Sequence, residues 1–204
     1  MRKQVSAAHY DFAGYVTPAR FMSFWHQVDE VARLRARTVL EIGPGPGIVT
    51  GILRGQGVVV TTCDIADDTE ADVCASVIRL PFADGAFDVV ICCQVLEHLP
   101  FDDSLRALEE IRRVCSVGSV ISLPQASRYW PFTIHVPFMG ALKFGVRPPW
   151  RLKPHVFDGQ HHWEIDKAGY EEARILEQYG RVFTSVRSFR VHENHYHRFF
   201  ILQK

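Results

Sequence analysis

Two short clusters of acid, amide and imidazole side chains stand out in this sequence of 204 residues. The first reads QVLEH over residues 94–98, and the second reads QHHWE over residues 160–164. An imidazole can take up a proton near neutral pH, and a carboxylate together with imidazoles can ligate a divalent cation. The clusters therefore offer two kinds of chemistry: general base catalysis by His98, His161 or His162, or the binding of a divalent metal.

A glycine-rich segment, VLEIGPGPGIVT at residues 39–50, indicates where a ligand would bind. A strand that leads into such a turn and then a helix commonly holds a nucleotide-like ligand at the carboxyl edge of an open α/β sheet. Ile48 occupies the position where a GxGxxG dinucleotide fingerprint needs glycine, and the GKS or GKT of a Walker loop is absent. Glu41 would repel a pyrophosphate but tolerates a cationic ligand. Asp64 is suited to accept hydrogen bonds from two ribose hydroxyls, for NAD as for other nucleosides.

The elements that must position these residues follow an alternating pattern. Strands are expected at Thr38–Ile42, Val58–Cys63, Ala86–Cys93 and Ser119–Leu123, and near 181–191 and 197–203. Helices are expected at 18–37, Gly47–Arg54, Asp103–Cys115 and Asp166–Tyr179. Short apolar strands that alternate with helices predict an α/β, Rossmann-like, doubly wound and mostly parallel seven-stranded sheet. Because no helix separates the last two strands, we expect the last strand to be antiparallel.

Residues 128–156 interrupt this alternation. The segment holds five prolines, two tryptophans, five Lys and Arg residues, and no acid. We expect one domain over residues 1–204 that carries this segment, to about residue 160, as an irregular aromatic and basic lid. Cations interleaved with aromatics also suit a nucleic-acid backbone with stacked bases, or an anionic lipid surface. A lid over a small substrate ranks first, because the rest of the chain is not basic.

Composition sets the remaining bounds. Lys plus Arg and Asp plus Glu both number 23, so global charge points to no partner. No window approaches the roughly 18 apolar residues of a membrane span, and the first residues lack the apolar core of a leader peptide. The five cysteines form no CxxC pair and are expected to be reduced in a cytoplasmic protein. His195 and His197 would share one face of a strand near His192, where we expect a rim or hairpin rather than a metal cluster.

The segment LPFADGAFDVVICCQVLEHLP at residues 80–100, taken with VLEIGPGPG and CDI, resembles the class I S-adenosylmethionine-dependent methyltransferases. The resemblance is to the type 11-like group with the LPF…FD…LEHL pattern, and it is strong over residues 38–125. It implies a methyltransferase that uses S-adenosylmethionine. The cofactor-binding residues implied by the family motifs are Glu41, Gly43, Gly45, Gly47, Asp64, Ile65, Ser76, Val77 and Gln94.

Two positions depart from the family pattern. Ser76 stands where the family usually has an acid that contacts the adenine amino group, and Asp72 is a nearby acid that could substitute. Gln94 stands where the small-RNA 2′-O-methyltransferases have the first acid of an ExxEH segment. In those enzymes that segment and a later histidine bind Mg²⁺, and here the matching positions are Glu97, His98 and His161. A neutral amide at position 94 weakens a site for a hard cation.

The resemblance leaves the methyl acceptor open. We expect O-methylation of a small or lipid-linked molecule, with His98, His161 or His162 as the base. Metal-assisted methylation of an RNA ribose, with a divalent metal such as Mg²⁺, is the alternative. A second alternative is an inactive partner subunit that binds S-adenosylmethionine. Peripheral membrane contact fits the basic and aromatic segment, and the sequence gives no oligomeric state.

Overall fold

The fold was derived from a computed structural model that describes residues 12–67 and 69–204. The N-terminal residues on which the leader-peptide prediction depends lie outside this range. A short helix, α1 (Phe12–Tyr15), precedes the long helix α2 (Pro18–Arg33). The hydroxyl of Thr17 caps α2 by accepting a hydrogen bond from the backbone N–H of Arg20 at 3.2 Å. Pro18, at the first helical position, has no backbone N–H that would need a partner there.

Seven strands form the central sheet in the order β3-β2-β1-β4-β5-β9-β8. They are β1 (Thr38–Ile42), β2 (Val59–Asp64), β3 (Val73–Cys74), β4 (Phe87–Cys93), β5 (Cys115–Pro124), β8 (Ser185–Arg190) and β9 (His197–Gln203). The strands from β3 to β5 are parallel, and β9 pairs antiparallel with both β5 and β8. The predicted Rossmann-like sheet with an antiparallel last strand is confirmed.

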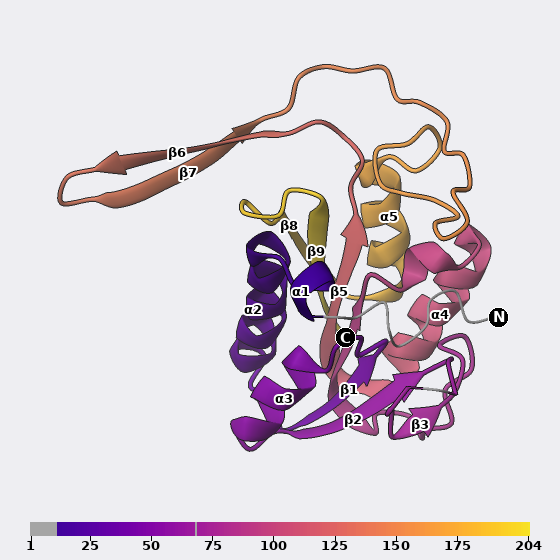
Figure 1. Cartoon of the computed structure of the whole chain (residues 1–204). Coiled ribbons are helices and arrows are strands. Elements are labelled where there is room, and N and C mark those ends of the chain that lie inside the picture. The colour runs from indigo at the N-terminus through magenta and orange to yellow at the C-terminus, as the bar shows by residue number, and fades with distance from the viewer. Residues whose placement is uncertain (1–11, 68) are drawn as a thin grey trace.

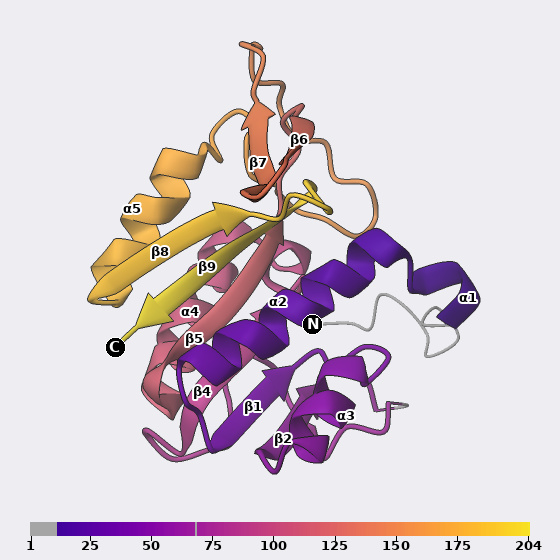
Figure 2. The same ribbon diagram turned by 90° about the vertical axis from the view of Figure 1, so that its left-hand side faces the viewer.

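Helices cover both faces of this sheet (Figures 1 and 2). Helices α2 and α3 (Ile48–Gly55) lie on one face, and α4 (Phe101–Val114) and α5 (Glu172–Val182) lie on the other. Each face has its own apolar core. Val39, Leu53 and Phe199 pack on the α2 side, while Leu40, Leu108 and Phe200 pack on the α4 side, all of them fully buried. Adjacent residues of one strand therefore serve opposite cores, as the two-residue period of a strand requires.

The segment predicted to be irregular contains a β-hairpin. Strands β6 (Trp130–Val136) and β7 (Gly140–Val146) pair antiparallel and project from the body of the protein beyond the end of β5 (Figure 1). Apolar residues alternate along both strands, so the period of a strand was present in the sequence. The five prolines of the segment mask it, but only Pro131 lies inside a strand.

One predicted helix begins later than expected. The sequence predicted a helix from Asp166, whereas α5 begins at Glu172. Asp166 has a φ of 65° and Gly169 a φ of 86°, so the chain turns through left-handed conformations that no helix continues. All five cysteines are free, and three of them, Cys63, Cys92 and Cys115, are buried. Within the described residues, no helix has the length and apolar character to cross a bilayer.

Candidate active site

A cavity of about 610 Å³ lies at the carboxyl ends of β1, β2 and β4. Its floor is formed by the turns that follow these strands. Its walls come from α1 and α2, from the 3₁₀ turn η2 (Leu96–His98), from residues 160–161 and from residues 196–197. This is the place where the glycine-rich turn was expected to hold a ligand.

The glycine turn after β1 has the backbone that the sequence implied. Gly43, Gly45 and Gly47 all have positive φ, and the first two line the cavity. A Cβ on Gly43 would stand 2.7 Å from Cγ2 of Val95, so only glycine fits between the turn and the segment after β4. Gly47 does not line the cavity; it is the N-cap of α3 in the left-handed conformation.

Glu41 lies at the floor of the cavity with its side chain almost fully buried. Its Oε2 accepts a hydrogen bond from the Thr50 hydroxyl. Burial raises the pKa of Glu41 from 4.5 to about 7, because desolvation outweighs this hydrogen bond. A cationic ligand would compensate the buried charge, so the site favours a positively charged ligand over an anionic one.

The end of the cavity beside β2 and β3 suits a nucleoside. Asp64 and Ile65 line it from one side and Val77 from the other. Oδ1 of Asp64 accepts the N–H of Ala66 at 2.8 Å, which fixes the carboxylate at the end of the strand. Ser76 does not line the cavity, and its buried hydroxyl has no hydrogen-bond partner among the described residues. Asp72 cannot replace the family's acid, because it also lies off the cavity and its Oδ2 binds Thr62 and Arg54.

Gln94 directly follows β4 and lines the cavity together with Glu97, His98 and His161. Its φ of 56° is left-handed, which is uncommon for a residue other than glycine and typical of functional turns. Its Nε2 donates to Ser122 Oγ at 3.2 Å, and its backbone N–H donates to Ser122 O at 2.9 Å. These bonds hold the side chain in the cavity wall.

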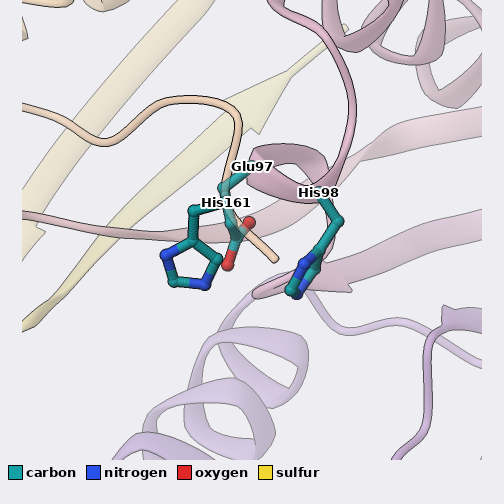
Figure 3. A group of neighbouring side chains, drawn as sticks. All are labelled: Glu97, His98 and His161. Carbon is teal, nitrogen blue, oxygen red and sulfur yellow. The ribbon is translucent and has the colours of Figure 1, made fainter. Parts of the chain in front are cut away.

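Glu97, His98 and His161 converge beside Gln94 (Figure 3). One potential ligand atom from each of the three residues lies within 4.8 Å of the others. The Glu97 side chain is completely buried, and neither carboxylate oxygen has a hydrogen-bond partner among the described residues. Desolvation raises the pKa of Glu97 to about 8, and burial lowers the pKa of His98. A carboxyl in this environment holds a proton at neutral pH unless a cation replaces it.

His161 is oriented by a carboxylate that the sequence analysis did not assign to the site. Its Nδ1 lies 2.9 Å from Oε1 of Glu164, and the Tyr196 hydroxyl donates to the same oxygen at 2.5 Å. The hydrogen bond to His161 lowers the pKa of Glu164, and the same contact raises the pKa of His161. An ionised carboxylate only accepts, so Nδ1 carries the proton and Nε2 is left to accept another.

His162 does not share this environment. It does not line the cavity, and its ring packs against that of Phe157 with 4.6 Å between the ring centres. Its backbone N–H donates to the backbone oxygen of Glu97 at 2.8 Å. Of the two histidines in QHHWE, the structure therefore brings only His161 to the cavity. Trp163 is buried, its ring packs edge-on against that of Phe101 in α4, and its Nε1 donates to the backbone oxygen of Leu99 at 3.2 Å.

The third histidine-rich run, at residues 192–197, makes no metal site with its own members in the part of the chain that the structure describes. His195 stacks on Tyr129, and His197 begins β9 and lines the cavity. Burial lowers the pKa of His197 to about 3, so it is a neutral polar group in the wall. The run that was predicted to form a rim or hairpin therefore contributes part of the cavity wall.

Helices α1 and α2 supply wall residues that the sequence analysis missed. Arg20, Ser23 and Gln27 line the cavity from one face of α2, and Tyr15 lines it from α1. The guanidinium of Arg20 lies 3.9 Å from the centre of the Tyr15 ring, which places a cation at this wall. The spacing of three and four residues puts these polar side chains on one helix face. That spacing was visible in the sequence next to the apolar stripe of the helix, and it is the signal that could have indicated these wall residues.

The strand order, the glycine turn and the cavity at the carboxyl edge together define the fold of the class I S-adenosylmethionine-dependent methyltransferases. Residues 40–123 match the family model described as a methyltransferase domain.

Two curated proteins are similar to part of this chain. An uncharacterized methyltransferase of Mycobacteroides abscessus is 30% identical over 126 residues, which cover 54% of this chain and 48% of that protein. The ubiquinone biosynthesis O-methyltransferase of Pseudomonas paraeruginosa is 28% identical over 116 residues, covering 50% of this chain and 49% of that protein. The chain thus spans about half the length of these curated relatives.

Among solved structures, the fold is similar to that of 1,6-didemethyltoxoflavin-N1-methyltransferase from Burkholderia thailandensis. That structure contains 1,6-didemethyltoxoflavin and S-adenosylhomocysteine. The TM-score is 0.62 at 18% identity, and the similarity covers 92% of this chain and 78% of that one. The likeness extends well beyond residues 40–123, so the flanking elements follow the same fold.

Proposed function

We propose that the protein transfers the methyl group of S-adenosylmethionine to an oxygen atom of a small or lipid-linked molecule, with His161 as the general base. The observation that carries the proposal is the ordered contact from Tyr196 through Glu164 to His161 at the cavity wall. A relative named as an O-methyltransferase and a structural neighbour with a bound small molecule support the substrate class.

The cofactor would occupy the floor of the cavity. Asp64 would accept hydrogen bonds from the ribose hydroxyls, Ile65 and Val77 would pack on the adenine, and Gly43 and Gly45 would let the backbone approach the methionine part. Glu41 would offset the positive charge of the sulfonium and amino groups. The methyl group would then lie beside Gln94, next to His161.

The transfer is a displacement at carbon. The acceptor oxygen forms a bond to the methyl carbon while the carbon–sulfur bond breaks, and its electron pair stays on sulfur to give S-adenosylhomocysteine. The acceptor's proton passes to Nε2 of His161, whose positive charge is stabilised by the ionised Glu164. Because the sulfonium is already a good leaving group, alignment and this proton transfer are the contributions left to the protein.

The test compares His161→Ala with His162→Ala as the matched control, using radiolabelled S-adenosylmethionine and a panel of phenols and prenylated phenols. Loss of the base should lower kcat by about 10²–10⁴-fold while the cofactor Kd measured by calorimetry changes little. His162→Ala should keep kcat within a few-fold, since His162 lies off the cavity. Cofactor binding without transfer to any acceptor, for wild type and variants alike, would favour the inactive partner subunit.

A second candidate, metal-assisted methylation of an RNA ribose, is favoured by the buried carboxylate of Glu97. Glu97, His98 and His161 would hold a divalent cation, which would lower the pKa of a bound hydroxyl. Glu164 would orient His161 in this case as well, as outer carboxylates do for metal-bound histidines. The donor set fits a cation, and its imidazoles suit Mn²⁺, Co²⁺ or Zn²⁺ more than Mg²⁺.

Titration of Mn²⁺ followed by calorimetry separates the two candidates. Under the metal hypothesis, wild-type protein binds Mn²⁺ and Glu97→Gln does not, and a single-stranded RNA with a free 3′ ribose is methylated in a chelator-sensitive reaction. Under the general base hypothesis, chelators leave methyl transfer to the small acceptor unchanged. No heat of Mn²⁺ binding to the wild type would eliminate the second candidate.

A further inference from the structure

The hairpin formed by β6 and β7 projects from the body of the protein (Figure 1), and the apolar side chains of one of its faces are exposed to solvent. Cross-strand pairs bring together side chains that lie on the same face, and each of them is about half exposed. They are Trp130 with Val146, Phe132 with Phe144, and Ile134 with Leu142. At the tip, Phe138 and Met139 are 109% and 73% exposed. A two-stranded hairpin with one apolar face is marginal in water, so this surface is expected to have a partner.

The opposite face of the hairpin contacts the protein. Thr133 hydrogen-bonds to His192 at 3.0 Å, and Lys143 forms an ion pair with Glu193. Thr133 and Lys143 are cross-strand neighbours, and they alternate with the apolar pairs. The hairpin is therefore amphipathic, with a polar side directed to the loop before β9 and an apolar side left free.

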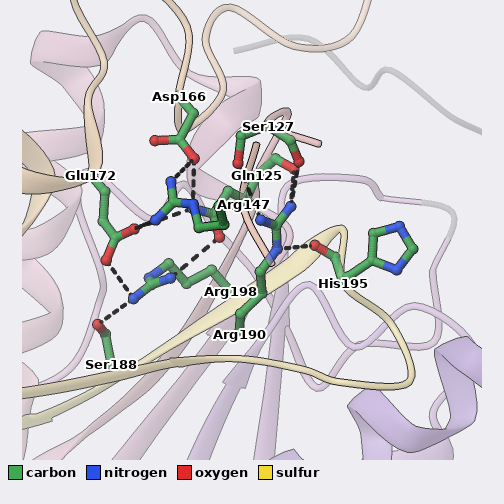
Figure 4. A network of polar contacts seen from close by, with 9 residues as sticks. All are labelled: Gln125, Ser127, Arg147, Asp166, Glu172, Ser188, Arg190, His195 and Arg198. Carbon is green, nitrogen blue, oxygen red and sulfur yellow. Dashed lines mark hydrogen bonds and ion pairs between the residues drawn. The ribbon is translucent and has the colours of Figure 1, made fainter. Parts of the chain in front are cut away.

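Networks of charged and polar contacts fix both ends of the hairpin (Figure 4). At its start, the guanidinium of Arg190 donates to the carbonyl oxygens of Gln125, Ser127 and His195. At its end, Arg147 binds Asp166 at 2.7 Å and Glu172 at 2.9 Å. Multiple charge-assisted bonds of this kind order a segment, so the projection of the hairpin is a fixed feature of the fold.

The segment of the chain that carries the apolar face is positively charged. No Asp or Glu occurs between residues 111 and 157. Arg128, Arg151 and Lys153 are exposed, and none of them pairs with a carboxylate among the residues that the structure describes. Arg128 lies 4.1 Å from the ring centre of Trp150, at the base of the hairpin. An apolar surface with tryptophans and cations at its margin is complementary to a bilayer surface with anionic headgroups.

We propose that the β6–β7 hairpin docks the protein on an anionic lipid surface. The apolar face and the tip would enter the boundary between headgroups and acyl chains, roughly 5–10 Å deep. Both strands keep an open edge of backbone N–H and C=O groups, which prevents deeper insertion into hydrocarbon. A second copy of the chain fits this surface less well, because it would bring a second positively charged segment instead of the anionic groups that a lipid surface supplies.

Docking would also orient the cavity. The Arg190 anchor binds His195, and the adjacent Tyr196 and His197 line the cavity wall. The hairpin base and the cavity mouth thus share one short segment, so a docked protein would hold its cavity close to the lipid surface. This inference stands apart from the proposed methyl transfer, since lipid binding needs neither cofactor nor acceptor.

Vesicle sedimentation without cofactor tests the proposal, using phosphatidylcholine vesicles with and without phosphatidylglycerol. Wild-type protein should bind the vesicles that contain phosphatidylglycerol, and the binding should weaken with added salt. The double substitution Phe138→Ser with Met139→Ser should lower the partition coefficient by at least about tenfold. Val59→Ser, which removes an exposed apolar side chain from β2, is the matched control and should leave binding unchanged.

A second variant pair separates charge from apolar contact. Arg151→Ser with Lys153→Ser should weaken binding to anionic vesicles and leave any residual binding to neutral vesicles unaltered. Absence of wild-type binding, or equal binding by the tip variant, would overturn the proposal. So would a wild-type dimer in analytical ultracentrifugation that becomes a monomer in the tip variant without vesicles, or preferential binding of a single-stranded RNA. Unchanged cofactor affinity of the variants, measured by calorimetry, verifies that they are folded.

Discussion

Substitution of Glu41 by Gln isolates the cost of burying a carboxylate at the floor of the cavity. Glu41 is 3% exposed, and burial raises its pKa from 4.5 to about 7. The amide oxygen of glutamine can still accept the hydrogen bond that the Thr50 hydroxyl donates to Glu41. The variant therefore removes the charge and keeps the shape and the main contact.

The sign and size of the effect follow from the two pKa values. A carboxyl with a higher pKa in the folded state binds more protons there, so its ionisation destabilises the fold as pH rises from 4.5 to about 7. A rise from 4.5 to about 7, at about 1.4 kcal/mol for each pKa unit, corresponds to about 3 kcal/mol above the folded pKa, at about pH 8.5. At about pH 5.5, only about 1 kcal/mol of this cost is present. Relative to wild type, the variant should gain about 2 kcal/mol between these conditions.

Urea unfolding of the cofactor-free protein at the two pH values measures this difference. The control is Glu177→Gln, which removes an exposed carboxylate paired with Arg181 on α5 and should show no comparable change with pH. A constant difference between Glu41→Gln and wild type at both pH values would refute the reasoning. The variant should also lose affinity for S-adenosylmethionine more than for S-adenosylhomocysteine, which lacks the sulfonium charge.

Further substitutions test other parts of the structure. Asp64→Asn should weaken cofactor binding by about tenfold in calorimetry, whereas Asp67→Asn, at an exposed position off the cavity, should not. Gly43→Ala should lower cofactor affinity by about tenfold or more, because the residue has a φ of 68° and its Cβ would clash with the segment after β4. Gly118→Ala should destabilise by about 1–3 kcal/mol or more, since its Cβ would meet a β9 carbonyl oxygen at 2.1 Å. Gly180→Ala, in open space on α5, should instead stabilise by about 0.5–1 kcal/mol in the same denaturation assay.

Much of the fold could be predicted from local patterns. Strands β1 and β9 have the predicted bounds, because a run of apolar residues bordered by turn residues marks a buried strand. The hairpin was missed since its prolines outweighed a clear alternation of apolar residues. The start of α5 was wrong because left-handed backbone at Asp166 and Gly169 depends on tertiary contacts that periodicity does not report.

The residues of the site also fall into those that the sequence could predict and those that it could not. Asp64 ends one strand and the turn glycines follow another, so their approach to the cavity could be predicted from the order of elements alone. Arg20, Gln27 and Tyr196 reach the cavity from segments far away in the sequence. Local spacing places Arg20 and Gln27 on one face of a helix, but it does not show that this face borders the cavity. The choice between His161 and His162 also required the structure, because adjacent residues in an irregular segment have no fixed direction.

The cavity wall is assembled from segments at both ends of the chain as well as from its centre. The floor belongs to residues 40–123, the part that matches the methyltransferase domain family. Part of the cavity wall comes from α2, from residues 160–161 and from the start of β9, which lie outside that range, whereas Glu97 and His98 beside His161 lie inside it. Under the proposed function the floor would hold the cofactor and the flanking segments would border the acceptor, so chimeras that join this centre to another relative's flanking segments should change the acceptor that is methylated.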